Sequence, residues 1–346
     1  MTRLDSLELY SAAIAMCDQV VGAVERARDV RGLPDASLIN NVVVAGMGTS
    51  GLAGDLLQAV AGPLASVPVH VVKTYECPAF VGSSTLFIAV SYSGNTEETV
   101  ACAIAARAAG AHIVVVAAGG ALQALAAQWD APFGKVDASL PSARSALGAL
   151  AIPPIAVLDE IGLMPGARRG IRAVVDQLRL RRDECMASDG GPAALLARRI
   201  GRTIPILHGG EPLGAVAALR WKTQINENAK CPAFVAVQPD LCHNELVGWG
   251  QHGDATRQLM TLVALRHSGE HMQTRRRFDF TAEALREVYS DVIEVAGEGD
   301  GLLAEFFDLA FLGDLVSLHL AFNEGLDPGP SPIVDSLKAT LSPRPS

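Results

Sequence analysis

The chain has 346 residues, of which 49% are hydrophobic and 5% aromatic, and its 28 basic and 37 acidic side chains give a formal net charge of -9. This acidic balance argues against a nucleic-acid-binding protein, which would carry a basic face. The length is sufficient for two domains of ordinary size, each with a mainly aliphatic core.

The opening segment "LDSLELYSAAIAMCDQVVGAVERARDV" is interrupted by acids, and it predicts an amphipathic helix rather than a signal peptide. No uninterrupted apolar run reaches membrane-spanning length. The six cysteines include no C-x-x-C pair, which indicates reduced thiols rather than a disulfide framework or a zinc site. We therefore expect a cytoplasmic protein with neither a membrane nor a nucleic acid as its partner.

Short apolar runs alternate with helix-forming segments in the first part of the chain. Buried strands are predicted at residues 40–45, 68–72, 86–90 and 112–116. Between them, "GMGTSGLAGDLLQAV" predicts a glycine turn that runs into a helix, and "SYSGNTEETV" predicts a polar loop ahead of another helix. This alternation favours parallel β-α-β units with right-handed crossovers.

A boundary between two domains is predicted in "AIPPIAVLDEIGLMPGARRG", where Pro153, Pro154 and Pro165 should break regular structure. The expected domains are residues 1–152 and 153–346. The second half repeats the order of strand, glycine turn and helix in "TIPILHGGEPLGAVAALRWKTQINENAK", and further strands are predicted at 261–265 and 292–296. The predicted fold class is α/β, with two related domains that each contain a mostly parallel sheet flanked by helices.

The stretch "SYSGNTEETV" lies at a predicted strand-to-helix joint. There the first backbone N–H groups of the helix lack partners and the helix dipole is positive, so an anion is the natural ligand. Ser91, Ser93 and Thr96 add neutral donors. A simpler interpretation stays open, in which Thr96 is only an N-cap and the two glutamates after it complement the dipole.

The segment from Gly46 to Gly51 matches G-x-G-x-x-G, and Glu76 is placed to end a following strand as a ribose-binding acid would. A nicotinamide-dependent oxidoreductase is therefore an alternative. However, a dinucleotide site needs one such turn, whereas this domain offers two donor-rich loops. Two loops better suit a phosphate monoester that is held by backbone amides and hydroxyls. These hydroxyls belong to Ser50, Ser91, Ser93 and Thr96.

Acid–base candidates occur in "NENAK" and "CHNELVGW". Glu227 lies near the end of a predicted helix, where the dipole opposes a carboxylate and makes it a better base. His243 precedes the predicted start of another helix. Each has a structural alternative, as a polar helix end and as a structural histidine. In "HSGEH", His267 and His271 could suggest a metal, but Gly269 interrupts the pair and a turn is favoured.

Six segments, taken in order, resemble the motifs of the bifunctional phosphoglucose/phosphomannose isomerase family, which is built from two sugar isomerase (SIS) domains. They are "GMGTSGLAGD", "SYSGNTEET", "LPSARSALG", "NENAK", "HNE" and "SPIVDSLK". The similarity spans nearly the whole chain. It departs in "PSAR", where proline and arginine are further apart than expected, and at Ser331, where the family favours threonine.

The resemblance implies an aldose–ketose isomerase that acts on glucose 6-phosphate, and also on mannose 6-phosphate, to give fructose 6-phosphate. Glu227 would transfer the proton, Arg144 would face the reacting carbons and His243 would open the sugar ring. The residues implied to hold the substrate are Gly48, Thr49, Ser50, Ser91, Ser93, Thr96, Ser331 and Lys338.

The resemblance also implies no metal or nicotinamide cofactor. It implies a homodimer with shared sites, in which His243 crosses a two-fold interface. A catalytically silent sugar-phosphate sensor is the alternative from another functional class.

Overall fold

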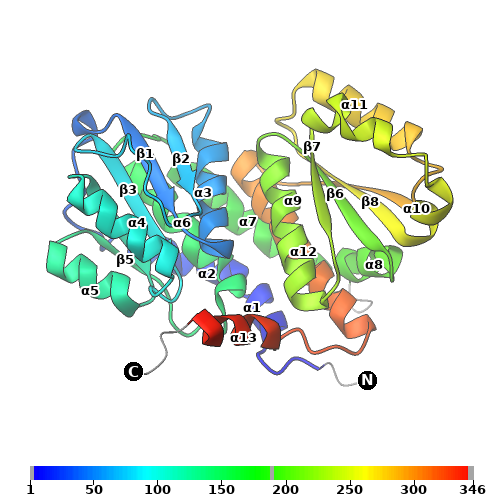
Figure 1. The fold of residues 1–346 in the computed structure, drawn as a ribbon, viewed down its shortest axis with the longest axis horizontal. Helices are drawn as coiled ribbons and strands as arrows, with labels where there is room; N and C mark the ends of the chain where they lie inside the picture. Colours follow the sequence, from blue (N-terminus) through cyan, green and yellow to red (C-terminus); the bar gives the residue numbers. More distant parts are fainter. Residues whose placement is uncertain (1–3, 188–190, 342–346) are drawn as a thin grey trace.

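The computed structural model describes residues 4–187 and 191–341. Within these residues two parallel sheets lie side by side, one in each half of the molecule, with helices between and around them (Figure 1). The predicted α/β fold with two parallel-sheet units is therefore confirmed.

The first sheet has the strand order β2-β1-β3-β4-β5, and neighbouring strands pair in parallel. The strands are β1 (Asn41–Ala45), β2 (Val69–Val72), β3 (Thr85–Ser91), β4 (His112–Ala117) and β5 (Phe133–Lys135). The four predicted strands are confirmed, whereas β5, which has three residues, was not predicted. Helices α4 (Glu97–Ala108) and α5 (Gly120–Trp129) cover one face, and α3 (Gly48–Ala61) packs on the other.

The second sheet has the order β7-β6-β8-β9 and is also parallel. Its strands are β6 (Ile204–Gly210), β7 (Phe234–Gln238), β8 (Met260–Arg266) and β9 (Asp291–Ala296). Sequence patterns predicted all of these except β7. Helices α9 (Leu213–Gln224) and α12 (Leu302–Asn323) pack toward the first half, while α10 (Gly253–Leu259) and α11 (Met272–Ala284) lie on the outer side (Figure 1).

The expected break in regular structure at Pro153 and Pro154 is wrong. Both prolines lie inside α6 (Leu147–Glu160), which is buried over most of its length. Burial against α2 and α3 outweighs the local cost of the two prolines, because packing supplies most helical stability in proteins. The chain leaves the helix later, where Gly162 and Gly166 have positive φ angles. A boundary after residue 152 would divide this helix, and it stays a prediction.

The single predicted N-terminal helix is two helices, α1 (Leu9–Ile14) and α2 (Met16–Ala27). The remaining helices are α7 (Ala167–Cys185), α8 (Gly191–Ile200) and α13 (Pro332–Leu341), with a short 3-10 turn η1 at Ala36–Leu38.

Helix α12 is buried from Leu303 to Ala321, and one apolar core joins it to inner faces of both sheets. Helix α13 lies along the lower edge of the molecule in Figure 1 and points toward the first half. Across the described ranges, the helices are not long and apolar enough to cross a bilayer.

A buried histidine in β6 predicts how stability depends on pH. His208 is 1% exposed, and burial lowers its pKa from 6.5 to about 4. Between these values the unfolded chain binds a proton that the folded chain excludes, so the free energy of unfolding should fall as the pH falls, by up to about 3 kcal/mol. Urea unfolding at pH 7 and pH 4.5 measures this loss. His208→Leu should lose less than the parent protein, and an identical loss would contradict the assignment.

Candidate functional site

The glycine turn after β1 lies at the carboxyl end of the first sheet. A Cβ on Gly51 would lie 2.6 Å from the Gly46 carbonyl oxygen, so only glycine permits this close crossing. Gly48 has a φ of +53°, and a Cβ there would meet open space. The turn therefore presents Gly48, Thr49 and Ser50 at the end of β1, as the sequence predicted.

The hydroxyl loop after β3 lies against this glycine turn. The Tyr92 N–H donates to Ser50 Oγ at 3.3 Å, which joins the two loops. Ser91 Oγ accepts from the Gly94 N–H at 3.1 Å and lies 2.9 Å from Thr96 Oγ1. Thr96 occupies the N-cap position of α4, but its side chain does not cap the helix. Its hydroxyl contacts Ser91 Oγ instead, so simple capping does not explain the threonine.

The tip of the hydroxyl loop is held from behind by the start of α5. Asn95 Oδ1 accepts from the Ala121 N–H at 2.8 Å, and Ser93 Oγ accepts from the Asn95 N–H at 3.2 Å. Gly94 has a φ of +70°, and a Cβ there would lie 1.8 Å from the Gly119 carbonyl oxygen. This close approach fixes the loop and leaves Ser93 exposed.

Glu227 lies where α9 widens into a π-helical turn, η3 (Ile225–Ala229). Its position at a helix end was predicted. The Arg144 Nη1 group donates to Glu227 Oε2 at 3.2 Å. The arginine side chain is 9% exposed and the glutamate side chain 45% exposed, so a buried cation faces an accessible carboxylate.

Arg144 lies on a 3-10 turn, η2 (Ala143–Ser145), just before α6. Its Nη1 also donates to Ser331 Oγ at 3.1 Å, and its Nη2 donates to the carbonyl oxygens of Pro328 and Gly329 at 2.8 and 2.5 Å. The arginine therefore brings the segment ahead of α13 to the side of Glu227. The unusual spacing in "PSAR" does not prevent this arrangement.

Lys230 is a site neighbour that the sequence analysis did not single out, although it ends the motif "NENAK". Its Nζ donates to the carbonyl oxygens of Glu227 and Pro330, at 2.6 and 2.7 Å. Burial, together with the charge of Arg144, lowers the pKa of this lysine. Lys230 thus ties the π-helical turn to the same C-terminal segment.

Arg220 in α9 is the second residue that sequence reasoning missed. It is fully buried, and its Nε and Nη2 donate to the two carboxylate oxygens of Asp314 at 2.8 and 2.6 Å. Its Nη1 also donates to Thr49 Oγ1 at 3.2 Å, and its Nη2 to the Arg144 carbonyl oxygen at 2.6 Å. One side chain therefore links the glycine turn to the backbone of Arg144. The sequence signal is weak, because α9 and α12 are mostly apolar but each carries other charged side chains besides Arg220 and Asp314.

Among the described residues, no hydrogen bond or ion pair joins His243 to Glu227, whose carboxylate contacts Arg144. His243 is exposed at the end of a 3-10 turn, η4 (Asp240–His243), which is followed by η5 (Glu245–Gly248). Glu227 precedes β7 and His243 follows it, and five strand residues span about 16 Å. Lys338 is exposed on α13, two helical turns beyond Ser331.

Two other sequence interpretations can be judged directly. Strand β2 ends at Val72, so the expectation that Glu76 ends this strand is wrong; Glu76 lies in the following loop. The turn in "HSGEH" is confirmed. His267 Nε2 lies 3.2 Å from the Gly210 carbonyl oxygen, and His271 caps α11 with its ring, so both histidines have structural partners.

The second sheet contains a counterpart of the hydroxyl loop. Five residues separate β8 from α11, as five separate β3 from α4, and Ser268-Gly269 occupies the place of Ser93-Gly94. Here, however, the Ser268 N–H and hydroxyl both donate to the carboxylate of Glu305, which is 3% exposed. The donors of the second loop are therefore taken by an internal carboxylate.

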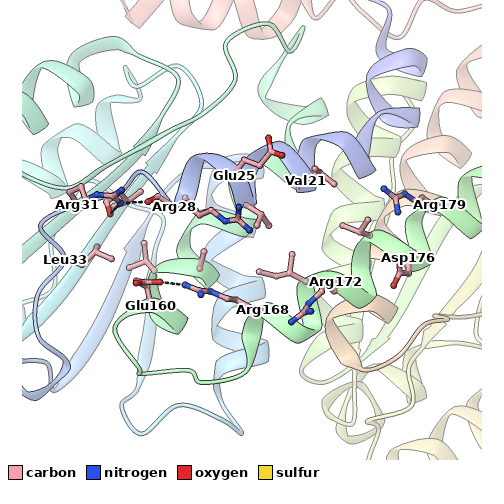
Figure 2. A pocket seen from close by; sticks show the side chains of 17 residues that line it. Val21, Glu25, Arg28, Arg31, Leu33, Glu160, Arg168, Arg172, Asp176 and Arg179 are labelled. Carbon is pink, nitrogen blue, oxygen red and sulfur yellow. Dashed lines mark hydrogen bonds and ion pairs between the residues drawn. The ribbon is translucent and has the colours of Figure 1, made fainter.

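A large hollow lies away from these loops. It is a groove of about 880 Å³ between α2, α6 and α7, with arginines around an apolar floor (Figure 2). The arginines are Arg28, Arg31, Arg168, Arg172 and Arg179. Among the described residues, those that line this groove include no member of the predicted site.

Comparison with known proteins identifies both halves of the chain. Residues 39–130 match the SIS domain family, and residues 190–341 match the family described as bacterial phospho-glucose isomerase C-terminal SIS domain. The C-terminal domain of a glucosamine-fructose-6-phosphate aminotransferase from Francisella tularensis has a similar fold, with a TM-score of 0.69, 15% identity and coverage of 92% of this chain and 97% of that chain. The fold and the two matches define a protein of two SIS domains.

Curated relatives narrow the identification. A bifunctional phosphoglucose/phosphomannose isomerase from Caldicellulosiruptor bescii is 33% identical, over 96% of this chain and 99% of its own length. One from Aquifex aeolicus is 30% identical, over 89% of this chain and 92% of its own length. The chain belongs to the bifunctional phosphoglucose/phosphomannose isomerase family.

The buried pair beneath the site predicts a large stability effect. Asp314→Asn leaves the Arg220 guanidinium buried without a counter-charge, which should lower the free energy of unfolding by about 3–5 kcal/mol. The exposed pair Arg257–Glu287 provides the control, and Glu287→Gln should cost at most about 1 kcal/mol. Urea unfolding of both variants measures the difference. Equal losses would show that the buried pair has no special role.

Proposed function

We propose that the protein interconverts glucose 6-phosphate, and also mannose 6-phosphate, with fructose 6-phosphate. The observation that carries the proposal is the Arg144–Glu227 pair, which Arg220 links to the glycine turn and its neighbouring hydroxyl loop. The relatives named as bifunctional isomerases, which match nearly the whole chain, support the choice of substrates.

The proposed chemistry needs the phosphate anchored at one end of the sugar, so that C1 and C2 lie beside a single base at the other. Glu227 removes the C2 proton to form a cis-enediolate and returns the proton to C1. Arg144 offsets the negative charge that develops on oxygen. The hydroxyls of Ser50, Ser91 and Thr96 are assigned to the phosphate. His243 is assigned to ring opening.

The remaining substrate contacts in the proposal come from backbone and side chains around these loops. They are Gly48, Thr49, Ser93, Ser331 and Lys338. We also infer a cytoplasmic location, which the free state of all six cysteines supports.

Neither alternative function is favoured. An oxidoreductase finds no support among the curated relatives, and Glu76 does not end β2. A non-catalytic sensor needs only the groups that bind the sugar phosphate, and an accessible carboxylate beside a buried arginine is not required for binding. Isomerisation assays with both hexose phosphates, with chelator and without added nucleotide, test the three functions together. Sugar-phosphate binding without turnover would favour the sensor, and tight binding of NAD(P) would favour the oxidoreductase.

Replacement of the proposed base gives a direct test. Glu227→Gln keeps the shape of the side chain and removes its basicity, so kcat should fall by about 100- to 10,000-fold. Hexose phosphate binding, measured by calorimetry, should persist because the anchor is unchanged. Glu287→Gln, which changes an exposed glutamate outside the site, should keep full activity. Near-normal turnover of Glu227→Gln would show that another group transfers the proton.

The anchor predicts a different kinetic signature. Ser91→Ala combined with Thr96→Ala removes two hydroxyl donors and should raise KM by about 10- to 100-fold. A decrease in kcat is also expected, because binding energy from the phosphate positions the reacting carbons. Ser37→Ala, at an exposed serine of η1, is the control. Unchanged kinetics in the double variant would remove the phosphate assignment.

We further propose a homodimer in which each site takes His243 from the partner chain. The separation of His243 and Glu227 by β7 supports this arrangement, and a closed two-fold dimer is the commonest oligomer. Homodimers of Glu227→Gln and of His243→Ala should then both be nearly inactive. A mixed dimer would carry one doubly damaged site and one intact site.

Mixing these two variants under conditions that exchange subunits should therefore restore activity. Native mass spectrometry verifies the exchange, and the isomerase assay measures the recovery. If every site drew both residues from one chain, all sites in the mixture would stay damaged. Confirmed exchange without recovery would thus place His243 and Glu227 in the same chain.

A further inference from the structure

A small cavity lies directly behind Arg144. Its volume is about 10 Å³, and all the side chains that line it are buried. Three of these residues carry a buried polar atom that has no hydrogen-bond partner among the described residues. The atoms are Arg144 Nε, Gln224 Oε1 and Asn228 Oδ1.

The orientations of both amides follow from their other contacts. Gln224 Nε2 donates to the Arg144 carbonyl oxygen at 3.3 Å, so Oε1 must be the free end. Ser317 Oγ donates to the Asp314 carbonyl oxygen at 2.6 Å and therefore accepts from Asn228 Nδ2 at 2.9 Å. This leaves Asn228 Oδ1 as an acceptor. The cavity thus meets one N–H donor and two carbonyl acceptors without partners in the described part of the chain. The other polar side chains that line it already have partners, because Ser145 Oγ donates to the Ser142 carbonyl oxygen and the Asp314 carboxylate accepts from Arg220.

This set of partners selects one ligand. A water molecule can accept from Arg144 Nε while it donates to both amide oxygens, which satisfies all three atoms. A cation would leave the Nε–H without an acceptor and would lie against a guanidinium, and an anion would face two carbonyl oxygens. The volume also matches one water, which needs about 10–15 Å³ and two to four polar partners.

We propose that Gln224 and Asn228 hold a single buried water against Arg144 Nε, and that both act through it as positioning residues. Arg144 has five N–H donors, and the other four go to Glu227, Ser331 and the two carbonyls before α13. The water completes this set. Because Asn228 adjoins Glu227 in the π-helical turn, the water also couples the arginine to the turn that carries the glutamate.

The water itself can be tested without any reference to activity. A crystal structure of the full chain at about 1.5 Å resolution should show one density peak within about 2.7–3.2 Å of all three atoms. An empty cavity, or a direct contact between Arg144 Nε and a protein acceptor, would overturn the proposal. This readout stands even if the isomerase assignment fails.

The positioning role rests on the proposed isomerase function. Its test is a variant that displaces the water, compared with a matched control variant. Ala13 lines the cavity and Ala12 does not, although both are buried in α1. Ala13→Val should fill the cavity, remove the density peak and lower kcat by about 10-fold with KM little changed, because the phosphate anchor is intact. Ala12→Val adds the same two methyl groups elsewhere and should keep kcat. If Ala13→Val lost the water but turned over as fast as Ala12→Val, the positioning role would be excluded while the isomerase function stood.

Discussion

The buried ion pair between Arg220 and Asp314 is the interaction on which the geometry of the site depends. Burying a guanidinium without a counter-charge is strongly destabilising, so Asp314 in α12 stabilises Arg220 in the core. Once there, its remaining donors reach Thr49 and the Arg144 backbone. Both targets belong to the first half of the chain, whereas the ion pair belongs to the second. The relative placement of the two halves is thus fixed at the point where the proposed phosphate and proton-transfer ends meet.

The first four strands of each half have the same order, and the loops after β3 and β8 have the same length, yet the two loops differ in how their serines are bonded. In the first half, Ser93 is exposed and the hydroxyls around it contact one another. In the second half, Glu305 supplies a carboxylate to the equivalent Ser268. Donors at the start of a helix attract an anion. In the second half, the carboxylate of Glu305 takes the place that an anionic ligand would occupy. The same local architecture therefore builds a candidate site in one domain and a structural contact in the other.

Sequence patterns predicted the elements whose signals are local. Strands such as β3 and β8 are buried on both faces and appear as continuous apolar runs, whereas β5 is short and β7 is an edge strand whose Phe234 is 53% exposed. Glu227 and Thr96 could be found because helix ends and strand ends have recognisable residues. Arg220 could not, since its partner Asp314 lies 94 positions away and a single sequence does not show which buried charges pair.

The contrast between Arg144 and Glu227 follows from how each is held. Arg144 is buried, and its Nη2 donates to two backbone carbonyls, so its charge cannot move without breaking these contacts to the chain. Glu227 is accessible, and its carboxylate contacts Arg144 through one oxygen. A fixed cation lowers the barrier by being in place before charge develops, while a base that serves two adjacent carbons must shift between them. The fold thus holds Arg144, the proposed stabilising charge, in place and leaves Glu227, the proposed proton carrier, accessible.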